Sequence, residues 1–386
     1  MASIDVIAPN GKRLPAGSKA PKGARYRARW RTPDGASRVA TFARRVDAEN
    51  HLHKMELTKR AGAYVDRAAG RITVGAYAAE WVARQPHRPA TAVSVGVILR
   101  VHILPTFARR PIAQVRHSEV QAWVTGLAQE LAPSTVATVF GKLAGIFASA
   151  VDDGLIARTP CKGVRLPRKV GGEVVPMDPA EVRAMVDATP ARYRALIVLL
   201  AGSGLRPGEA LGLTVDRVDF LRRTIRVDRQ LLTVSRKEPA FGPPKTPASV
   251  RTIPVPQSVL DALADHLHHY PTTPSGLIFT DSKSDPIRRN ALGHVWRRAR
   301  TAANAEKVVV RDFTPHDLRH YAASVLISSG LSVKAVQRHL GHASATTTLD
   351  CYAHLWPDAE DTTRAALEAG IGRVVSQPCQ SQAQEA

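Results

Sequence analysis

The chain has 386 residues, of which 44% are hydrophobic, so it is long enough for two or three domains with apolar cores. Lys and Arg number 54 against 33 Asp and Glu, which gives a net charge of +21 and predicts a polyanionic partner. Because the basic residues are spread along most of the chain, and not gathered in one tail or amphipathic helix, the charge favours nucleic acid over an anionic membrane.

The three cysteines, Cys161, Cys351 and Cys379, lie far apart and form no CxxC pair. Their spacing predicts neither a disulfide framework nor a thiolate zinc site. The first ten residues lack a basic segment followed by a long apolar run, and the apolar stretch 195–202 is too short to span a bilayer. We therefore expect a soluble, cytoplasmic protein that is neither exported nor bound to a membrane.

The first seventy residues form the first predicted unit, residues 1–70, with 15 Lys or Arg against six Asp or Glu. Basic and other side chains alternate over 25–31, Pro33-Asp34-Gly35 supplies turn residues, and 38–42 resumes the extended pattern, which predicts a β-hairpin. A helix from about Val46 to Arg60 follows and is expected to stop at Gly62. Aromatic residues within the basic strand favour a nucleic-acid-binding sheet over a solvated basic face. The predicted DNA contacts are Arg25, Arg27, Arg29 and Arg31.

The next stretch, 73–168, is predicted to be an all-α domain because apolar residues recur at helical spacing, as in Val120, Val124 and Leu127. Prolines, Pro105 among them, are expected to divide it into about four helices, and a basic segment with two glycines over 166–172 predicts a linker. A larger, mainly α domain with some strands is predicted over 177–370. It should begin with helices at 179–188 and 191–203 and contain strands around 218–227 and 251–255. The tail 371–386 is expected to be disordered.

Two segments of this last domain carry basic residues in unusual settings. Pro207 fits the first turn of a helix and leaves Arg206 at its N-terminal mouth, a place that favours anions. Taken alone, an Arg206 paired with Glu209 at the surface is the simpler interpretation. The Pro- and Ser-rich turn 244–254 is expected to place Lys245 at a hairpin tip. A loop lysine can protonate a leaving oxygen once neighbouring cations lower its pKa, although an isolated one is usually just solvated.

A third segment, 314–321, is predicted to start a helix with Thr314 as N-cap and Pro315 at the first helical position. His316 and Arg319 then share one helix face. His316 and His320 resemble half a zinc site, but the Glu of an HExxH motif is missing and Arg319 would lie among the ligands. The segment therefore predicts no metal.

In the fourth segment, Gly341 is expected to end one helix and Ser344 to cap the next, which places Tyr352 about two turns in, ten residues after His342. A lone Tyr at such a place is more often part of a core. Cys351 competes as the nucleophile by intrinsic reactivity, but a cysteine peptidase needs a partner His and an oxyanion site in place of two Arg and a Lys.

Taken together, six residues of these segments resemble the active site of the tyrosine recombinase, or phage integrase, family: Arg206, Lys245, His316, Arg319, His342 and Tyr352. The order Arg, Lys, His-x-x-Arg, Leu-Gly-His, Tyr matches the family pattern at every element, from 177 to about 355. The preceding helical region is similar to the family's core-binding domain. The basic first unit, with 62–66 leading to 73–77, resembles the arm-binding domain of actinobacterial phage and integrative-element integrases.

The resemblance implies a multidomain fold: a small α+β arm-binding domain, an all-α core-binding domain and a mixed, mainly α catalytic domain. It implies a site-specific DNA recombinase that cuts and rejoins strands through a 3′-phosphotyrosine, integrating or excising a phage or mobile element without metal, ATP or other cofactor. The implied roles are Tyr352 as nucleophile, Arg206 and Arg319 as phosphate clamp, Lys245 as general acid, His316 as proton acceptor and orienting group, His342 as phosphate hydrogen-bond donor and Glu209 as support for Arg206.

The implied partners are double-stranded DNA at core and arm sites, three further copies of the chain in a tetramer on DNA, a host DNA-bending protein and an excisionase. Alternatives remain. A type IB topoisomerase-like enzyme or a resolvase would use the same chemistry, but the basic first unit favours an integrase. A DNA-binding regulator that does not cut has no need of the six-residue set. A metal-dependent nuclease would be sensitive to EDTA.

Overall fold

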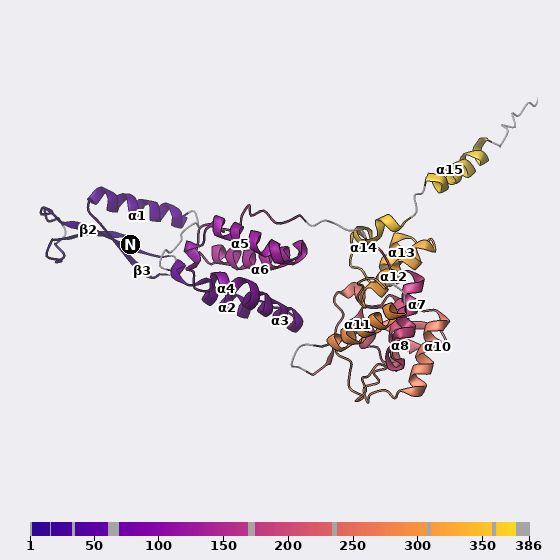
Figure 1. Ribbon diagram of the computed structural model, residues 1–386. Coiled ribbons are helices and arrows are strands. Elements are labelled where there is room, and N and C mark those ends of the chain that lie inside the picture. Colours follow the sequence, from indigo (N-terminus) through magenta and orange to yellow (C-terminus); the bar gives the residue numbers. More distant parts are fainter. Residues whose placement is uncertain are drawn as a thin grey trace, which may run out of the picture. The chain divides into compact units, whose positions relative to one another are not determined.

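The computed structural model describes residues 2–15, 17–32, 35–60, 69–168, 174–233, 238–306, 310–356 and 360–375. The chain divides into two compact units, Met1–Val170 and Gly171–Ala386, each considered by itself (Figure 1). The division falls within the predicted linker. The contacts do not separate 1–70 from 73–168, so that boundary stays a prediction. Several predicted features lie outside the described residues: the turn at Pro33-Asp34, the helix stop at Gly62, and most of the tail.

A three-stranded antiparallel sheet opens the first unit, in the order β1-β2-β3. Its elements, with the helix that follows, are β1 (Ser3–Ile7), β2 (Arg25–Arg31), β3 (Ser37–Phe42) and α1 (Arg45–Arg60). The β2–β3 pairing and the helix confirm the prediction, whereas β1 was not predicted. Helix α1 covers one face of the sheet, where Ala28 and Ala48 are fully buried and Trp30 contacts His51. Since side chains alternate along a strand, the four arginines of β2 lie on the opposite face.

The rest of the first unit is helical, as predicted: α2 (Val74–Arg84), α3 (Pro89–Ile98), the π-helical turn Leu99–Ile103, α4 (Leu104–Phe107), α5 (His117–Glu130) and α6 (Pro133–Asp152). Two helical runs, Pro89–Phe107 and Pro133–Asp152, are long and apolar enough by composition alone to cross a membrane. Apolar side chains of both nevertheless pack into one cluster, in which Leu143 and Phe147 are fully buried. They are the core helices of this bundle.

The prediction that Pro105 separates two helices is wrong. A proline inside a helix removes one hydrogen bond and its ring clashes with the carbonyl four residues earlier. Here the turn before it is widened, and the N–H of Leu104 bonds the carbonyl of Leu99. This π-helical turn makes room for the ring, and the helix continues to Phe107.

The second unit is mainly helical with two small sheets, β4-β5-β8 and β6-β7. Its elements are α7 (Pro179–Ala188), α8 (Ala191–Ser203), α9 (Pro207–Leu211), β4 (Val218–Asp219), β5 (Thr224–Val227), β6 (Gln230–Leu232), β7 (Ala240–Gly242), β8 (Arg251–Pro254), α10 (Gln257–His269), α11 (Arg289–Ala305), α12 (Asp317–Ser328), α13 (Val333–Leu340), α14 (Ala345–Tyr352) and α15 (Glu360–Val375). The helices α7 and α8 and both predicted strand regions are confirmed. Residues 371–375, assigned to a disordered tail, instead end α15.

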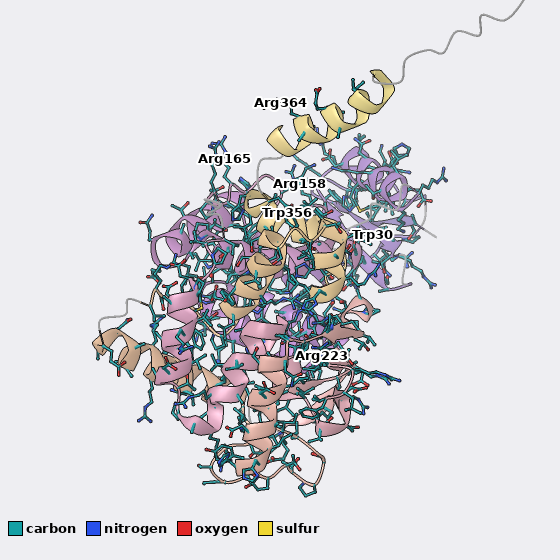
Figure 2. The ribbon with its side chains drawn as sticks, turned by 90° about the vertical axis from the view of Figure 1, so that its right-hand side faces the viewer. Trp30, Arg158, Arg165, Arg223, Trp356 and Arg364 are labelled. Carbon is teal, nitrogen blue, oxygen red and sulfur yellow. The ribbon has the colours of Figure 1, made fainter. Side chains whose placement is uncertain are left out.

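Helix α8 is the centre of the second unit, because Leu196, Ile197 and Leu200 on different sides of it are all fully buried. A smaller cluster joins α12, α13 and α14 and includes Leu340 and the side chain of Tyr352. These two clusters hold the ends of α8, α13 and α14 in place. Basic side chains project from the surface of both units, as Figure 2 shows for Arg158, Arg165, Arg223 and Arg364.

Candidate active site

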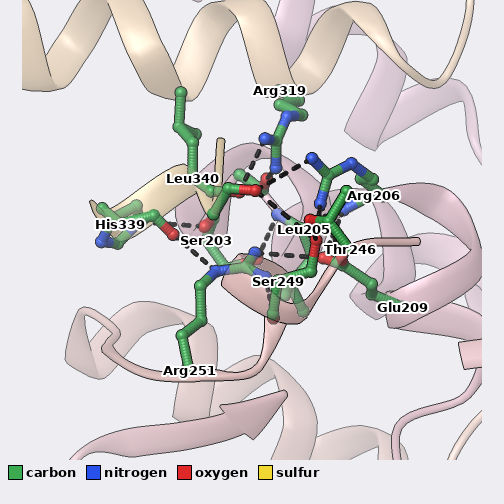
Figure 3. A network of polar contacts seen from close by, with 12 residues as sticks. Ser203, Leu205, Arg206, Glu209, Thr246, Ser249, Arg251, Arg319, His339 and Leu340 are labelled. Carbon is green, nitrogen blue, oxygen red and sulfur yellow. Dashed lines mark hydrogen bonds and ion pairs between the residues drawn. The ribbon is translucent and has the colours of Figure 1, made fainter. Parts of the chain in front are cut away.

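Arg206 lies where the sequence predicts, as the N-cap residue of α9 with Pro207 as the first helical residue. Its guanidinium donates to Glu209 Oε1 at 2.8 Å and to Ser249 Oγ at 3.0 Å, and its Nη2 donates to the Gly341 carbonyl at 3.2 Å. The simpler interpretation of a surface pair does not hold, because the Glu209 side chain is only 2% exposed. Arg206 thus joins three of the four segments singled out by the sequence (Figure 3).

Arg251 is a member of this network that sequence reasoning left without a role. Its Nη2 donates to Glu209 Oε2 at 3.0 Å, and its Nε donates to the His339 carbonyl at 2.7 Å. Burial of the Glu209 carboxyl opposes its ionisation, but Arg251 and Arg206 outweigh this effect and hold its pKa below the ordinary value. Glu209 is therefore a buried anion that fixes two guanidinium groups. The sequence signal for this residue is the run Ser249-Val250-Arg251-Thr252, which follows Lys245 and is part of the resemblance to the family pattern.

Arg319 is the most buried of the predicted phosphate ligands, with 2% of the residue exposed. It donates to the Gly204 carbonyl at the end of α8 and to the Leu340 carbonyl at the end of α13, both at 2.7 Å. Burial and the nearby Arg206 lower the pKa of Arg319 to about 9, so the guanidinium is still charged at neutral pH. The network formed by the described residues thus sets three guanidinium groups around one carboxylate, and this excess of positive charge suits a phosphodiester.

Tyr352 is the last residue of α14, which Ser344 caps as predicted by accepting a hydrogen bond from the Thr347 N–H. The ring is buried in the cluster of α12, α13 and α14, with 1% of the residue exposed. Burial raises the pKa of the Tyr352 hydroxyl to about 12, against the opposing effect of Arg319. The hydroxyl lies 2.7 Å from Nδ1 of His320. Tyr352 is therefore a core residue with a polar contact at its hydroxyl, so the core interpretation and the nucleophile interpretation are compatible.

His342 stacks on the ring of Tyr352, with ring centroids 6.4 Å apart and planes inclined by 8°. Its Nδ1 lies 2.8 Å from the hydroxyl of Thr348, a fully buried residue that sequence reasoning did not single out. Burial and the nearby Arg319 and Arg206 lower the pKa of His342 to about 3, so the imidazole is neutral at pH 7. The expected αL conformation of Gly341, at φ +68°, turns the chain from α13 towards His342.

His316 lies at the solvent edge of the site, as the residue before α12. Burial of part of its ring and the neighbouring His320 and Arg319 lower its pKa to about 4.

The expected start of helix α12, at Pro315, is wrong by two residues. Asp317 accepts from both the N–H and the hydroxyl of Thr314 at 2.7 Å, and α12 begins at Asp317. In the described parts of the chain no group of three His, Cys, Asp or Glu side chains is arranged to hold a metal ion.

Lys245 is exposed in the loop between β7 and β8. The predicted hairpin tip is wrong, because β7 pairs with β6 whereas β8 pairs with β5, so the loop crosses from one sheet to the other. The next residue, Thr246, has its hydroxyl 2.9 Å from Ser249, the partner of Arg206. The middle of the loop thus lies beside the arginine network, and no described side chain forms an ion pair with Lys245.

The arginines of β2 belong to the other unit and form a separate candidate surface. Arg29 pairs with Asp5 of β1 at 3.0 Å, and the same buried carboxylate pairs with Arg13 at 2.7 Å. Arg29 therefore helps to hold β1 against β2. Arg25 and Arg31 are exposed at the two ends of the strand. This face is a basic sheet surface, and among the described residues one of its four arginines, Arg29, is held by an ion pair.

Comparisons with known proteins show which family and fold this chain is similar to. Residues 176–358 match the phage integrase family. The prophage phiRv2 integrase of Mycobacterium tuberculosis is 28% identical over 338 residues, covering 84% of this chain and 88% of that protein. The integrase of the transposon Tn1549, solved in complex with a circular intermediate DNA, is 25% identical and superposes with a TM-score of 0.68 over 77% of this chain and 99% of the other. A lambda integrase tetramer bound to a Holliday junction is 16% identical, with a TM-score of 0.55 over 86% of this chain and 97% of the other, which shows a shared fold.

Proposed function

We propose that this chain, whose residues 176–358 match the phage integrase family, recombines DNA at specific sites through a covalent bond between Tyr352 and a 3′-phosphate. One observation carries this proposal: the Tyr352 ring lies in the cluster that includes Leu340, whose carbonyl is held by the buried Arg319. The ends of α8, α13 and α14 thereby fix a nucleophilic hydroxyl and the guanidinium groups that suit a phosphate.

The chemistry assigned to the site needs no external energy source. Tyr352 Oη attacks phosphorus while Arg206 and Arg319 bind the nonbridging oxygens, and the 5′-oxygen leaves with a proton from Lys245. His342, neutral and oriented by Thr348, is a further hydrogen-bond donor to the phosphate. The phosphotyrosine conserves the energy of the broken bond, so a new 5′-hydroxyl can reverse the reaction on another strand.

The remaining domains are assigned to DNA binding. Residues 73–168 are proposed to bind the core site together with the catalytic domain 177–370, and residues 1–70 are proposed to bind a distant arm site. The basic face of β2 supports the second assignment, because the sheet offers Arg25, Arg27 and Arg31 on the side away from α1. The pairing of Arg29 with Asp5 gives that arginine mainly a structural role.

We further propose that the enzyme acts in the cytoplasm as a tetramer on DNA and moves a phage or other mobile element. The lambda integrase tetramer on a Holliday junction supports the tetramer, and the prophage integrase of Mycobacterium tuberculosis supports the mobile element. A host DNA-bending protein and an excisionase remain predictions from the family resemblance.

The test is a suicide duplex that carries a core site from DNA flanking the gene, with a nick next to the cleavage position so that the released strand diffuses away. The full chain in EDTA should accumulate a covalent adduct on the 3′ side of the break, seen as a shifted band on a denaturing gel. Binding without an adduct would indicate a DNA-binding regulator, and cleavage only with added Mg²⁺ would indicate a nuclease. Either result would overturn the proposal.

A further inference from the structure

His320 is not one of the six residues of the family pattern, yet its imidazole lies within hydrogen-bond distance of the hydroxyl of the candidate nucleophile. Its Nδ1 lies 2.7 Å from the Tyr352 hydroxyl, a typical hydrogen-bond length, and the two ring centroids are 5.5 Å apart. His320 projects from the first turn of α12, and Tyr352 ends α14. Two helices that are packed in one apolar cluster therefore fix this pair.

The direction of the hydrogen bond follows from the protonation states. Burial raises the pKa of Tyr352 to about 12, so the hydroxyl carries its proton at neutral pH. The pKa of His320 is lowered by burial and by Arg319, against the opposing effect of Asp317, so the imidazole is neutral. The groups facing the imidazole are Asp317 and Arg319 on its own helix, His316 edge-on at 5.3 Å between centroids, and the Tyr352 ring. The Tyr352 hydroxyl thus donates to an unprotonated Nδ1, and Nε2 carries the imidazole proton.

His316, to which the family resemblance gives the role of proton acceptor, is placed differently. It is exposed at the edge of the site, and its ring stands at 87° to that of His320. Proton transfer needs the acceptor within hydrogen-bond distance of the proton it takes, with geometry considered before pKa. Of the two histidines, His320 meets this requirement at Tyr352.

We propose that His320 is a further catalytic residue, which accepts the proton of the Tyr352 hydroxyl as that oxygen attacks phosphorus and returns it during religation. The inference rests on the proposed function. In the forward step the bond between phosphorus and Tyr352 Oη forms and the bond to the 5′-oxygen breaks. The 5′-oxygen takes its proton from Lys245, and the phenolic proton moves to Nδ1. Religation reverses each transfer, so no external acid, base or oxidant is consumed.

A positioning role alone can be separated from proton transfer by one substitution. In His320→Asn the amide oxygen can occupy nearly the place of Nδ1 and accept the same hydrogen bond, but it cannot take up the proton at neutral pH. His354→Gln is a matched control, since His354 lies two residues after Tyr352 and its Nε2 contacts the Val174 carbonyl, at 2.9 Å. Gel-shift binding to the core duplex reports whether each variant is folded.

The experiment measures single-turnover adduct formation on the suicide duplex, with an oxygen or a sulfur at the 5′-bridging position, from pH 5 to 9. We expect His320→Asn to be slower by about 10²-fold or more on both substrates, since sulfur assists only the leaving group. His354→Gln should match the unsubstituted chain. The fall in rate at acid pH that comes from protonation of Nδ1 should be absent in His320→Asn. Replacing Tyr352 by a more acidic trifluorotyrosine should shrink the deficit.

Three results would overturn the inference: His320→Asn reacting at the rate of the unsubstituted chain, full rescue by the bridging sulfur, or a deficit that neither pH nor the fluorinated tyrosine changes. The last would leave His320 a positioning residue. If the unsubstituted chain itself forms no adduct, it is the proposed function that fails, so the two failures are distinguishable.

Discussion

Replacing Glu209 by Gln should destabilise the second unit strongly, because one carboxylate holds two guanidinium groups there. Glu209 accepts from Arg206 Nη1 at 2.8 Å, from the Arg206 backbone N–H at 3.1 Å and from Arg251 Nη2 at 3.0 Å. A glutamine has nearly the same shape but one acceptor oxygen, and its NH₂ group would face a second donor. The substitution therefore leaves two arginines without a compensating charge.

The magnitude follows from burial. The Glu209 side chain is 2% exposed and that of Arg251 is 5% exposed, so solvent cannot replace the lost contacts. Breaking a buried pair from one side costs about 3 to 5 kcal/mol. The exposed pair Arg183–Asp187, at 3.2 Å on α7, provides the control. Asp187→Asn should lower the free energy of unfolding by no more than about 0.5 kcal/mol.

The assay is denaturant unfolding of the full chain, with hydrogen exchange of the β5 and β8 peptides to identify the transition of the second unit. Glu209→Gln should lower its midpoint without changing the slope. The pKa of Glu209 is held below the ordinary value, so the ionised pair stabilises the fold above that value and the contribution is lost as the pH falls through the folded pKa. The difference between Glu209→Gln and the unsubstituted chain should therefore shrink in acid. A Glu209→Gln chain as stable as Asp187→Asn at pH 7 would refute the reasoning.

Three further predictions concern the reaction and the DNA. Lys245→Ala should slow cleavage by roughly 10² to 10⁴, and a 5′-bridging sulfur should rescue it but not Arg206→Ala; equal rescue in single-turnover assays would remove the general-acid role. Thr348→Val should reduce cleavage by about tenfold while core-site binding in gel shifts is kept, because His342 loses the hydroxyl at 2.8 Å that orients it; an unchanged rate would make that contact incidental. A chain without residues 1–70 should still cleave core sites but fail to integrate between full attachment sites in a plasmid assay, with a flatter salt dependence of binding. Normal integration by the truncated chain would mean that residues 1–70 are not an arm-binding domain.

Local sequence signals predicted the regular elements of the second unit well. The helices α7 and α8 begin and end where expected, and the glycine that ends α13 and the serine that caps α14 have the predicted conformations. These features depend on neighbours within four residues, so periodicity and capping preferences identify them.

Several errors arise where distant parts of the chain decide the structure. Strand β1 forms because Ser3–Ile7 pairs with β2 and Asp5 pairs with Arg29, contacts between residues 18 to 26 positions apart. The loop with Lys245 crosses between two sheets because β8 pairs with β5, which no local turn signal reveals. The contact of His320 with Tyr352 likewise depends on the packing of α12 against α14. The family pattern predicts the six site residues, but it cannot predict these supporting contacts.

The most direct test of the central claim is to locate the covalent bond on the protein. The adduct formed on a suicide duplex by the full chain is digested with protease and nuclease, and the modified peptide is sequenced by mass spectrometry. We predict a nucleotide on Tyr352, no adduct from Tyr352→Phe although it still binds the core site, and normal adduct from Cys351→Ser. A nucleotide on Cys351 or on any other residue, or an adduct from Tyr352→Phe, would contradict the assignment of Tyr352 as the nucleophile.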